Sequence, residues 1–342
     1  MHKYILILLA CLCLFSCNRA SEPMVSFSGS TMGTVYNVKY VNKAQASAKL
    51  SPQDMQKEVE ALLVEINQLM STYIPDSELS LLNQAEAGLS FPISAETKYV
   101  IQEAIKLHTL SNGMLDITIG PLVNLWGFGP ENRPDVVPTD RQLQDTMNFV
   151  GIDKFVLSDN RVNKRHDKVY IDLSTIAKGY GVDAIAELLT SQGVSNYLVD
   201  IGGEMRVAGS KLNQEDWLIA IEKPVTGARS VQKILSIGDN AIATSGDYSN
   251  YFEESGVRYS HLINPKTGFP IQHNLVSVSV VASKSIEADG LATALIVMGA
   301  KDGIAMAEQN DIAALFITKE GDEFVEYQTP AFEQRVTIKE FN

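Results

Sequence analysis

Cysteine is almost absent from this chain. Its three cysteines, Cys11, Cys13 and Cys17, all lie within the first 17 of 342 residues. If that leader is removed, the rest of the chain has no thiol for a disulfide, a zinc site or a catalytic nucleophile. Such a domain must rely on its hydrophobic core, and the 45% of hydrophobic residues supplies ample material for one.

Positive charge and common catalytic signatures are also scarce. Lysine and arginine number 28 against 41 aspartates and glutamates, for a net charge of -13. This acidity argues against nucleic acid as a partner, and it gives no support for broad adhesion to anionic lipid. The five histidines have no zinc-ligand spacing, and both the G-x-S-x-G elbow and the G-x-x-x-x-G-K-[ST] loop are missing. A nucleotide, if bound, therefore occupies a less familiar kind of site.

The N-terminal sequence is typical of a secretory leader. A lysine at position 3 precedes an apolar run over residues 4–15, which is too short to span a membrane as a mature helix. The run ends in Leu14-Phe15-Ser16-Cys17, which resembles the lipobox of bacterial lipoproteins, in which the cysteine is lipidated and becomes the new N-terminus. A plain signal peptide with chance cysteines is the alternative.

We therefore expect three parts. These are a lipoprotein signal peptide over residues 1–16, a lipidated tether over 17–24 and one domain over 25–342. A lipid on Cys17 would be the membrane attachment.

Apolar periodicity predicts a mixed α+β domain. Helical spacing is found over residues 51–70, 94–110, 176–192, 285–298 and 300–310. Alternating or apolar β runs are found over 25–40, 197–201, 205–208, 217–222, 231–237, 240–244, 276–282, 312–318 and 323–328. No repeat or internal linker divides them, so a single domain is the simpler interpretation.

The segment Val169–Asp183 places a lysine where a helix dipole disfavours it. A β-prone run over 169–173 leads into a helix that Ser174 or Thr175 can cap, which puts Lys178 in the first turn. An anion at this helix end would remove the conflict, and the glycines at 179 and 181 would let it approach the backbone. The segment therefore indicates a phosphate site, with an ordinary exposed lysine as the alternative.

Two further segments contain candidate metal-binding or catalytic residues. Asp289 and Thr293, four residues apart, share a helix face and offer oxygen ligands to Mg²⁺, unless they are merely a capping aspartate and a threonine bonded to its own helix. His261, just before a turn rich in proline and glycine, could act as a general base, although a solitary histidine at a strand end is usually structural.

Taken together and in this order, the segments closely resemble the ApbE family, the FAD:protein FMN transferases. The resemblance is carried by Thr31 to Thr34, Ser71 to Tyr73, Ser77 to Ser80, Leu115-Asp116, Gly120 to Gly127, Asp172 to Gly179, Asp200 to Gly203, Thr244 to Gly246, His261 to Gly268 and Ala288 to Thr293. Nearly the whole mature chain is covered, and members of this family are exported, often as lipoproteins.

The resemblance implies a fold and a set of site residues. The fold would be an α+β, T-fold-like single domain with largely antiparallel sheets packed with helices. FAD would be bound by Met32, Tyr73, Met114, Leu115, Asp116, Asp172, Lys178 and Ile263. Mg²⁺ would be held by Asp289, Thr293 and main-chain oxygens of Thr175 and Ala292. Ser174-Thr175 stands where small residues are usual, and a carboxylate that can occupy position 292 elsewhere is missing.

The resemblance also implies a reaction. A threonine or serine hydroxyl of an acceptor protein would attack the flavin-side phosphorus of FAD, with His261 as base, giving phosphoester-linked FMN and AMP. Acceptors would be flavin-carrying subunits of sodium-pumping or electron-transfer membrane complexes, and the enzyme would be lipid-anchored facing the periplasm, most simply on the inner membrane. The alternatives are a Mg²⁺-dependent FAD pyrophosphatase and a non-enzymatic flavin-binding lipoprotein.

Overall fold

A computed structural model describes residues 24–42, 49–130, 137–225, 230–247, 251–254 and 256–339. The leader, Cys17 and the tether up to residue 23 lie outside the described residues. Within the described part of the chain, no helix is both long and apolar enough to cross a membrane.

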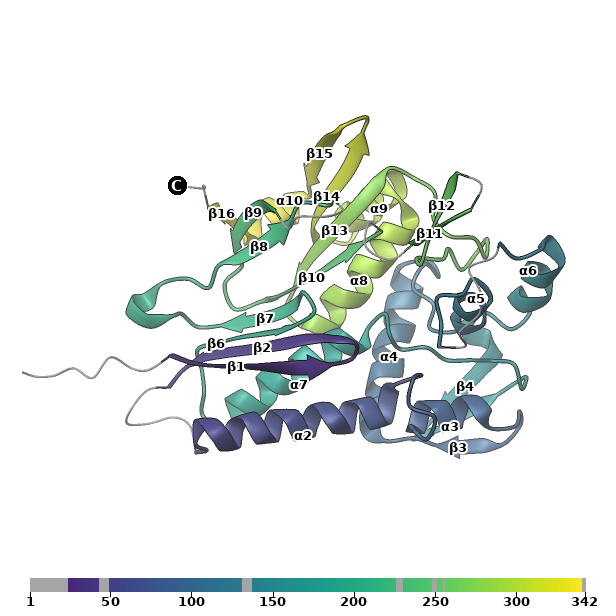
Figure 1. Cartoon of the computed structure of the whole chain (residues 1–342), viewed down its shortest axis with the longest axis horizontal. Helices are drawn as coiled ribbons and strands as arrows, with labels where there is room; N and C mark the ends of the chain where they lie inside the picture. Colours follow the sequence, from purple (N-terminus) through teal and green to yellow (C-terminus); the bar gives the residue numbers. More distant parts are fainter. Residues whose placement is uncertain are drawn as a thin grey trace, which may run out of the picture.

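One large antiparallel sheet organises the fold (Figure 1). Its strand order is β1-β2-β6-β7-β10-β13-β14-β15, and every neighbouring pair is antiparallel. The strands are β1 (Met24–Thr31), β2 (Thr34–Val41), β6 (Tyr197–Ile201), β7 (Glu204–Ala208), β10 (Ala241–Gly246), β13 (Leu275–Ala282), β14 (Ala313–Glu320) and β15 (Glu323–Gln328). The expected mixed fold with largely antiparallel sheets is thus confirmed.

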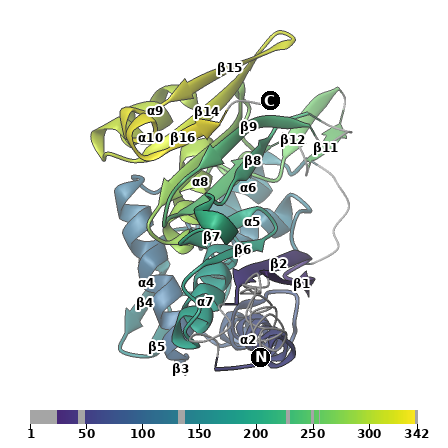
Figure 2. The ribbon, with the colours of Figure 1, turned by 90° about the vertical axis from the view of Figure 1, so that its left-hand side faces the viewer.

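Helices cover one face of this sheet. They are α2 (Pro52–Met70), α7 (Ala177–Ser191), α8 (Ser285–Met298) and α9 (Ala300–Gln309), and α4 (Ala95–Leu110) packs on α8 and α2. Helix α8 packs on β10, β13 and α7 and is buried almost throughout, which explains why its apolar residues show no single face. Figures 1 and 2 show α2 and α7 beside the β1-β2-β6 end of the sheet and α9 beside β14.

The opposite face is covered by a second sheet and a short helix. The sheet has the order β16-β9-β8 and comprises β8 (Ile219–Glu222), β9 (Val231–Ser236) and β16 (Thr337–Lys339), while α10 spans Pro330–Arg335. A separate apolar cluster that includes Trp217 and Phe332 fills the space between these layers. The central strands β13 and β14 are therefore buried on both faces over most of their length.

Smaller elements form the remaining parts. A sheet of order β3-β5-β4, comprising β3 (Ser90–Pro92), β4 (Phe155–Ser158) and β5 (Arg161–Lys164), lies with α3 (Glu78–Gln84) near α4. The hairpin β11 (Tyr251–Glu254) and β12 (Val257–Ser260) packs with α5 (Gly120–Leu125) and α6 (Asp140–Met147) around Trp126. Single 3₁₀ turns span Ile152–Lys154 and Leu212–Gln214.

Local signals in the sequence set the helix starts. Ser51, Ser77 and Ser94 are the N-caps of α2, α3 and α4, and each hydroxyl accepts a hydrogen bond from a backbone N–H in the first turn. The long helices therefore begin where the sequence predicts.

One local prediction was wrong. Residues 169–173 are mostly buried but do not form a strand. Gly120-Pro121 opens the helix α5. Proline is favoured in the first turn of a helix, because its missing N–H has no partner to lose there.

Candidate functional site

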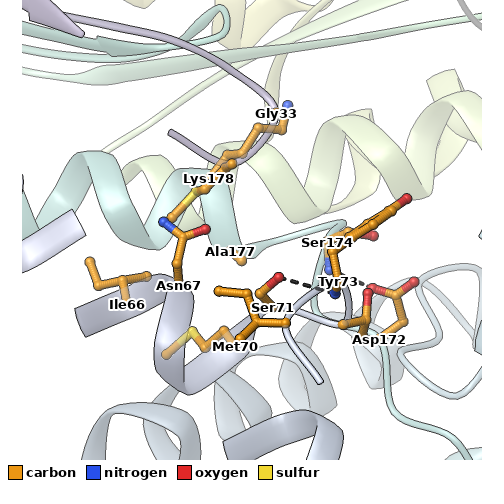
Figure 3. A pocket seen from close by; sticks show the side chains of 13 residues that line it. Gly33, Ile66, Asn67, Met70, Ser71, Tyr73, Asp172, Ser174, Ala177 and Lys178 are labelled. Carbon is orange, nitrogen blue, oxygen red and sulfur yellow. Dashed lines mark hydrogen bonds between the residues drawn. The ribbon is translucent and has the colours of Figure 1, made fainter. Parts of the chain in front are cut away.

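The described part of the chain contains a pocket of about 540 Å³ between α2, α7 and the turn that joins β1 to β2 (Figure 3). It is lined by Met32, Gly33, Ile66, Asn67, Met70, Ser71, Thr72, Tyr73, Ile74, Asp172, Ser174, Ala177 and Lys178. In the view of Figure 3, Gly33 and Lys178 lie on one side and Tyr73, Ser174 and Asp172 on the other. Four of the sequence-predicted ligand residues, Met32, Tyr73, Asp172 and Lys178, are thus brought together.

The β1–β2 turn forms one wall of the pocket. Its two central residues, Met32 and Gly33, have φ of 49° and 72°, a left-handed pair that suits a two-residue hairpin turn. The Asn67 side chain of α2 donates a 2.9 Å hydrogen bond to the hydroxyl of Thr31, which ties the turn to that helix. The Met32 side chain is thereby held at the pocket wall.

Tyr73 lies on the rim, in the loop after α2. The backbone N–H of Tyr73 donates to the Ser71 hydroxyl (3.1 Å), and the Ser71 carbonyl accepts from the hydroxyls of Ser77 (2.5 Å) and Ser80 (3.2 Å). These bonds fix the loop, while the tyrosine itself is 68% exposed. Its ring is therefore available to stack on a planar ligand.

Asp172 is presented by an extended segment that lacks a neighbouring strand. The side-chain amide of Asn83 takes the place of that strand, because it donates to the Ile171 carbonyl (2.8 Å) and accepts from the Ile171 N–H (2.8 Å). The Asp172 N–H bonds to the Ile117 carbonyl (2.7 Å), and the Asp172 carboxylate accepts from the Ser174 N–H (2.9 Å). Burial raises the pKa of Asp172, and the hydrogen bonds from Ser174 offset only part of that rise.

Helix α7 begins without a side-chain cap. Its N-cap is Ile176, so the expectation that Ser174 or Thr175 would cap it was wrong. The backbone N–H of Gly179 instead donates to the Asp289 carboxylate of α8 (2.9 Å). The predicted placement of Lys178 in the first turn is confirmed.

Lys178 lies against buried acidic side chains. Its Nζ lies 2.7 Å from Oε1 of Glu204, whose side chain is 4% exposed. Burial lowers the pKa of Lys178, but the attraction of Glu204 and Asp289 outweighs it, so the net pKa is raised. The lysine stays cationic at neutral pH and, at the edge of the pocket, can attract an anionic ligand.

Two of the candidate metal ligands, Asp289 and Thr293, lie on α8, which packs on α7. Burial raises the pKa of Asp289 to about 6. The attraction of Lys178 and the hydrogen bond from Gly179 lower the pKa, but they offset only part of that rise. One helical turn later, the Thr293 hydroxyl lies 3.2 Å from that of Ser245 on β10. Ala292, which lies between Asp289 and Thr293 in the sequence, is fully buried.

The donor set at this point fits a hard divalent cation. The buried hydroxyl of Thr175 and Oε2 of Glu204 have no hydrogen-bond partner among the described residues. Oxygen atoms from carboxylate, hydroxyl and carbonyl groups are the ligands that Mg²⁺ prefers. The described residues contain no cluster of three acidic, histidine or cysteine side chains for a metal, so main-chain oxygens would have to complete the set.

The other predicted ligand residues do not line this pocket. Leu115 is a core residue, and Met114 packs against the same core. The buried carboxylate of Asp116 accepts hydrogen bonds from the N–H (2.7 Å) and the hydroxyl (2.5 Å) of Thr118. Burial raises the pKa of Asp116, and these hydrogen bonds offset only part of that rise.

His261 and Ile263 follow β12 in a different part of the fold. Ile263 is buried in the cluster around Trp126. The His261 ring meets Phe128 edge-on, with centroids 6.4 Å apart.

Sequence reasoning missed Glu204 and Asn67. Glu204 follows the Gly202-Gly203 turn and starts β7, and an acidic residue at the start of a short strand was its only signal in the sequence. Asn67 is one polar position on an amphipathic helix and carries no signal of its own.

Comparison with known proteins decides the family. The sequence profile of the ApbE family matches residues 32–316. The chain belongs to the ApbE family. A curated "FAD:protein FMN transferase" of Vibrio cholerae serotype O1 is 50% identical over 332 residues, with 97% of this chain and 98% of the relative covered. Its counterpart from Haemophilus influenzae is 44% identical over 335 residues, with 96% of each covered.

Solved ApbE structures share the fold. The "Flavin Transferase ApbE from Vibrio cholerae" superposes with a TM-score of 0.85 at 49% identity, covering 92% of this chain and 99% of that one. The apo form of Pseudomonas stutzeri flavinyl transferase ApbE gives 0.84 at 37% identity, covering 92% and 96%. This ApbE chain is accordingly an enzyme of the transferase class.

Proposed function

We propose that this ApbE enzyme transfers the FMN part of FAD to a threonine or serine hydroxyl of an acceptor protein and releases AMP. The observation that carries the proposal is the 540 Å³ pocket, where Met32, Tyr73, Asp172 and Lys178 meet in a chain that is 50% identical to a curated FAD:protein FMN transferase. The pocket offers an aromatic rim at one side and a cation at the other, which suits a flavin joined to a pyrophosphate.

Different residues of the site would bind different parts of FAD. The exposed Tyr73 ring would stack on the flavin and limit access of water. Lys178, in the first turn of α7, would face the pyrophosphate, because a cation favours phosphate oxygens. Met114 to Asp116 and Ile263 would bind FAD beyond the pocket.

Asp289, Thr293 and the main-chain oxygens of Thr175 and Ala292 would hold Mg²⁺. The buried hydroxyl of Thr175, which has no hydrogen-bond partner among the described residues, would add a further oxygen ligand, because a buried polar group without a partner is costly unless a ligand satisfies it. When bound, the ion supplies positive charge that polarises the phosphoryl group and stabilises the leaving phosphate.

His261 would accept the proton of the attacking hydroxyl. As the new bond forms between that oxygen and the flavin-side phosphorus, the bond to the AMP phosphate breaks and its electron pair leaves with AMP. The imidazole takes up the hydroxyl proton, so charge and atoms balance.

The surroundings of the enzyme follow from the N-terminal sequence. Lipidation of Cys17 would anchor the protein facing the periplasm, most simply on the inner membrane, where flavin-carrying subunits of membrane complexes would be its acceptors. Labelling with a radioactive lipid precursor tests this: wild type should be labelled, and Cys17→Ala should not.

The first test mixes residues 18–342 with FAD, Mg²⁺ and a flavin-accepting subunit, then measures in-gel flavin fluorescence on the acceptor and AMP release. Equal amounts of labelled acceptor and AMP support the transferase. AMP with an unlabelled acceptor would instead identify a pyrophosphatase. FAD binding without either product would leave a flavin carrier.

A further inference from the structure

Strand β7 holds helix α7 through two ion pairs. Glu204 and Arg206 lie two residues apart and therefore project from the same face of the sheet. Glu204 pairs with Lys178 (2.7 Å) and Arg206 pairs with Asp183 (2.8 Å). Asp183 also accepts from backbone N–H groups at the start of α8, so the second pair has a clear structural role. The first pair has no such additional bond.

A structural role alone does not explain why the carboxyl group of Glu204 is buried. It is almost completely buried, and its Oε2 atom has no partner among the described residues. Burying a carboxylate for the sake of one ion pair brings little net stability, because desolvation offsets the attraction. Its position against Lys178 therefore points to a role in the site.

Two acids compete for the Lys178 ammonium. Lys178 is attracted by both Glu204 and Asp289. Among the described residues, the ion pairs within 4.0 Å include Lys178 with Glu204 but not Lys178 with Asp289. Asp289 accepts its hydrogen bond from the Gly179 N–H instead, which leaves its carboxylate without a side-chain cation in contact.

We propose that Glu204 is a positioning residue that holds the Lys178 ammonium beside the pocket and away from Asp289. This inference rests on the proposed function, in which Lys178 serves the pyrophosphate and Asp289 serves Mg²⁺. Glu204 keeps the two tasks apart, because Asp289 is the carboxylate that attracts Lys178 most strongly after Glu204. An ammonium seated on Asp289 would both compete with the metal and leave the phosphate side of the pocket.

A double-mutant cycle on the FAD-free protein tests this. Mg²⁺ affinity is measured by titration calorimetry for wild type, Glu204→Gln, Lys178→Met and the double variant. Glu326→Gln is the matched control, because it removes another 2.7 Å lysine–glutamate pair, with Lys233, from a different part of the sheet. Circular dichroism and thermal unfolding verify that each variant is folded.

The expected result is non-additive. Glu204→Gln should weaken Mg²⁺ binding about tenfold in the wild-type background and clearly less with Lys178→Met, because the competing ammonium is then gone. An equal loss in both backgrounds would overturn the proposal, since Glu204 would then act by its own charge or as a ligand. The control should bind Mg²⁺ like wild type.

A second readout separates positioning from general destabilisation. FAD binding without Mg²⁺, followed by flavin fluorescence, should weaken in Glu204→Gln about as much as in Lys178→Met; wild-type affinity in Glu204→Gln would contradict the proposal. If Glu204→Gln does not fold, Glu204→Asp takes its place in both measurements, with a smaller loss expected. Failure of the wild type to label an acceptor would refute the proposed function alone, because the Mg²⁺ cycle needs no FAD.

Discussion

The Asp289 carboxylate of α8 accepts a 2.9 Å hydrogen bond from the backbone N–H of Gly179 in the first turn of α7. The relationship is reciprocal, because Asp183 of α7 accepts from the N–H groups of Ser285 and Ile286 at the start of α8 (both 3.0 Å). Each helix thus caps the other with a carboxylate, which favours the positive end of a helix dipole. The crossed caps fix the candidate metal ligand relative to Lys178.

Gly179→Ala should disrupt this arrangement. A Cβ atom at position 179 would lie 2.4 Å from the Ser285 carbonyl oxygen and 2.7 Å from the Ile286 Cα, both of them backbone atoms. The two helix starts would have to separate, at a cost of about 1–3 kcal/mol in the free energy of unfolding, as for other overpacked sites. Chemical denaturation measures that loss, and Mg²⁺ affinity should fall with it.

Gly181→Ala is the matched control in the same helix. Its Cβ would meet only side-chain ends, Met32 Cε at 3.2 Å and Ile201 Cδ1 at 3.1 Å, which can move aside. Alanine is also the better helix former by about 1 kcal/mol, so little net change is expected. Equal destabilisation by the two substitutions would show that close helix contact does not explain Gly179.

Local features of the fold were predictable from the sequence, and its long-range contacts were not. The hydroxyl caps at Ser51, Ser77 and Ser94 act within four residues, so they set helix starts that a sequence pattern can reveal. The start of α7 is different, because its capping carboxylate comes from a residue 110 positions away. A search for nearby serine or threonine caps therefore named the wrong residues.

The same distinction applies to the site. Lys178 was identified because a cation in a first helical turn needs an anion, and the structure supplies two carboxylates in the chain itself. Glu204 lies 26 residues away from it, and only the pairing of β6 with β7 brings it there. The extended segment at Ile171 was mistaken for a strand because its apolar burial looks the same, while its partner is one side chain, Asn83.

Mg²⁺ binding should depend on pH through Asp289. Its pKa is raised to about 6, so the folded apo protein holds this proton more tightly than the unfolded chain does. Through this group, apo stability falls as pH rises from the ordinary value near 3.8 to about 6. Above pH 6 the free carboxylate can bind Mg²⁺, while below it affinity should fall about tenfold per pH unit.

Thermal unfolding with and without Mg²⁺ checks this dependence. The rise in Tm caused by Mg²⁺ should be large at pH 7.5 and nearly vanish at pH 5. Asp289→Asn should show no Mg²⁺-dependent rise at either pH. A rise that persists unchanged at pH 5 would rule out Asp289 as the titrating ligand.

Tyr73→Ala should weaken FAD binding, because it removes the exposed ring at the pocket rim. The expected loss is about 0.5–1.5 kcal/mol, the range for aromatic pairs, and Tyr73→Phe should retain most of the affinity. Flavin fluorescence titration measures both. Leu81→Ala, an exposed apolar residue on α3 outside the pocket lining, is the control and should bind FAD normally.

His261→Ala should separate catalysis from binding. In the proposed mechanism the imidazole takes the acceptor hydroxyl proton, so its loss should slow FMN transfer about 10²–10⁴-fold. FAD affinity should stay near the wild-type value, because His261 does not line the pocket with Tyr73 and Lys178. Single-turnover transfer to the acceptor and FAD titration give the two numbers. A variant that transfers at the normal rate, or that loses FAD binding and transfer together, would remove His261 from the role of general base.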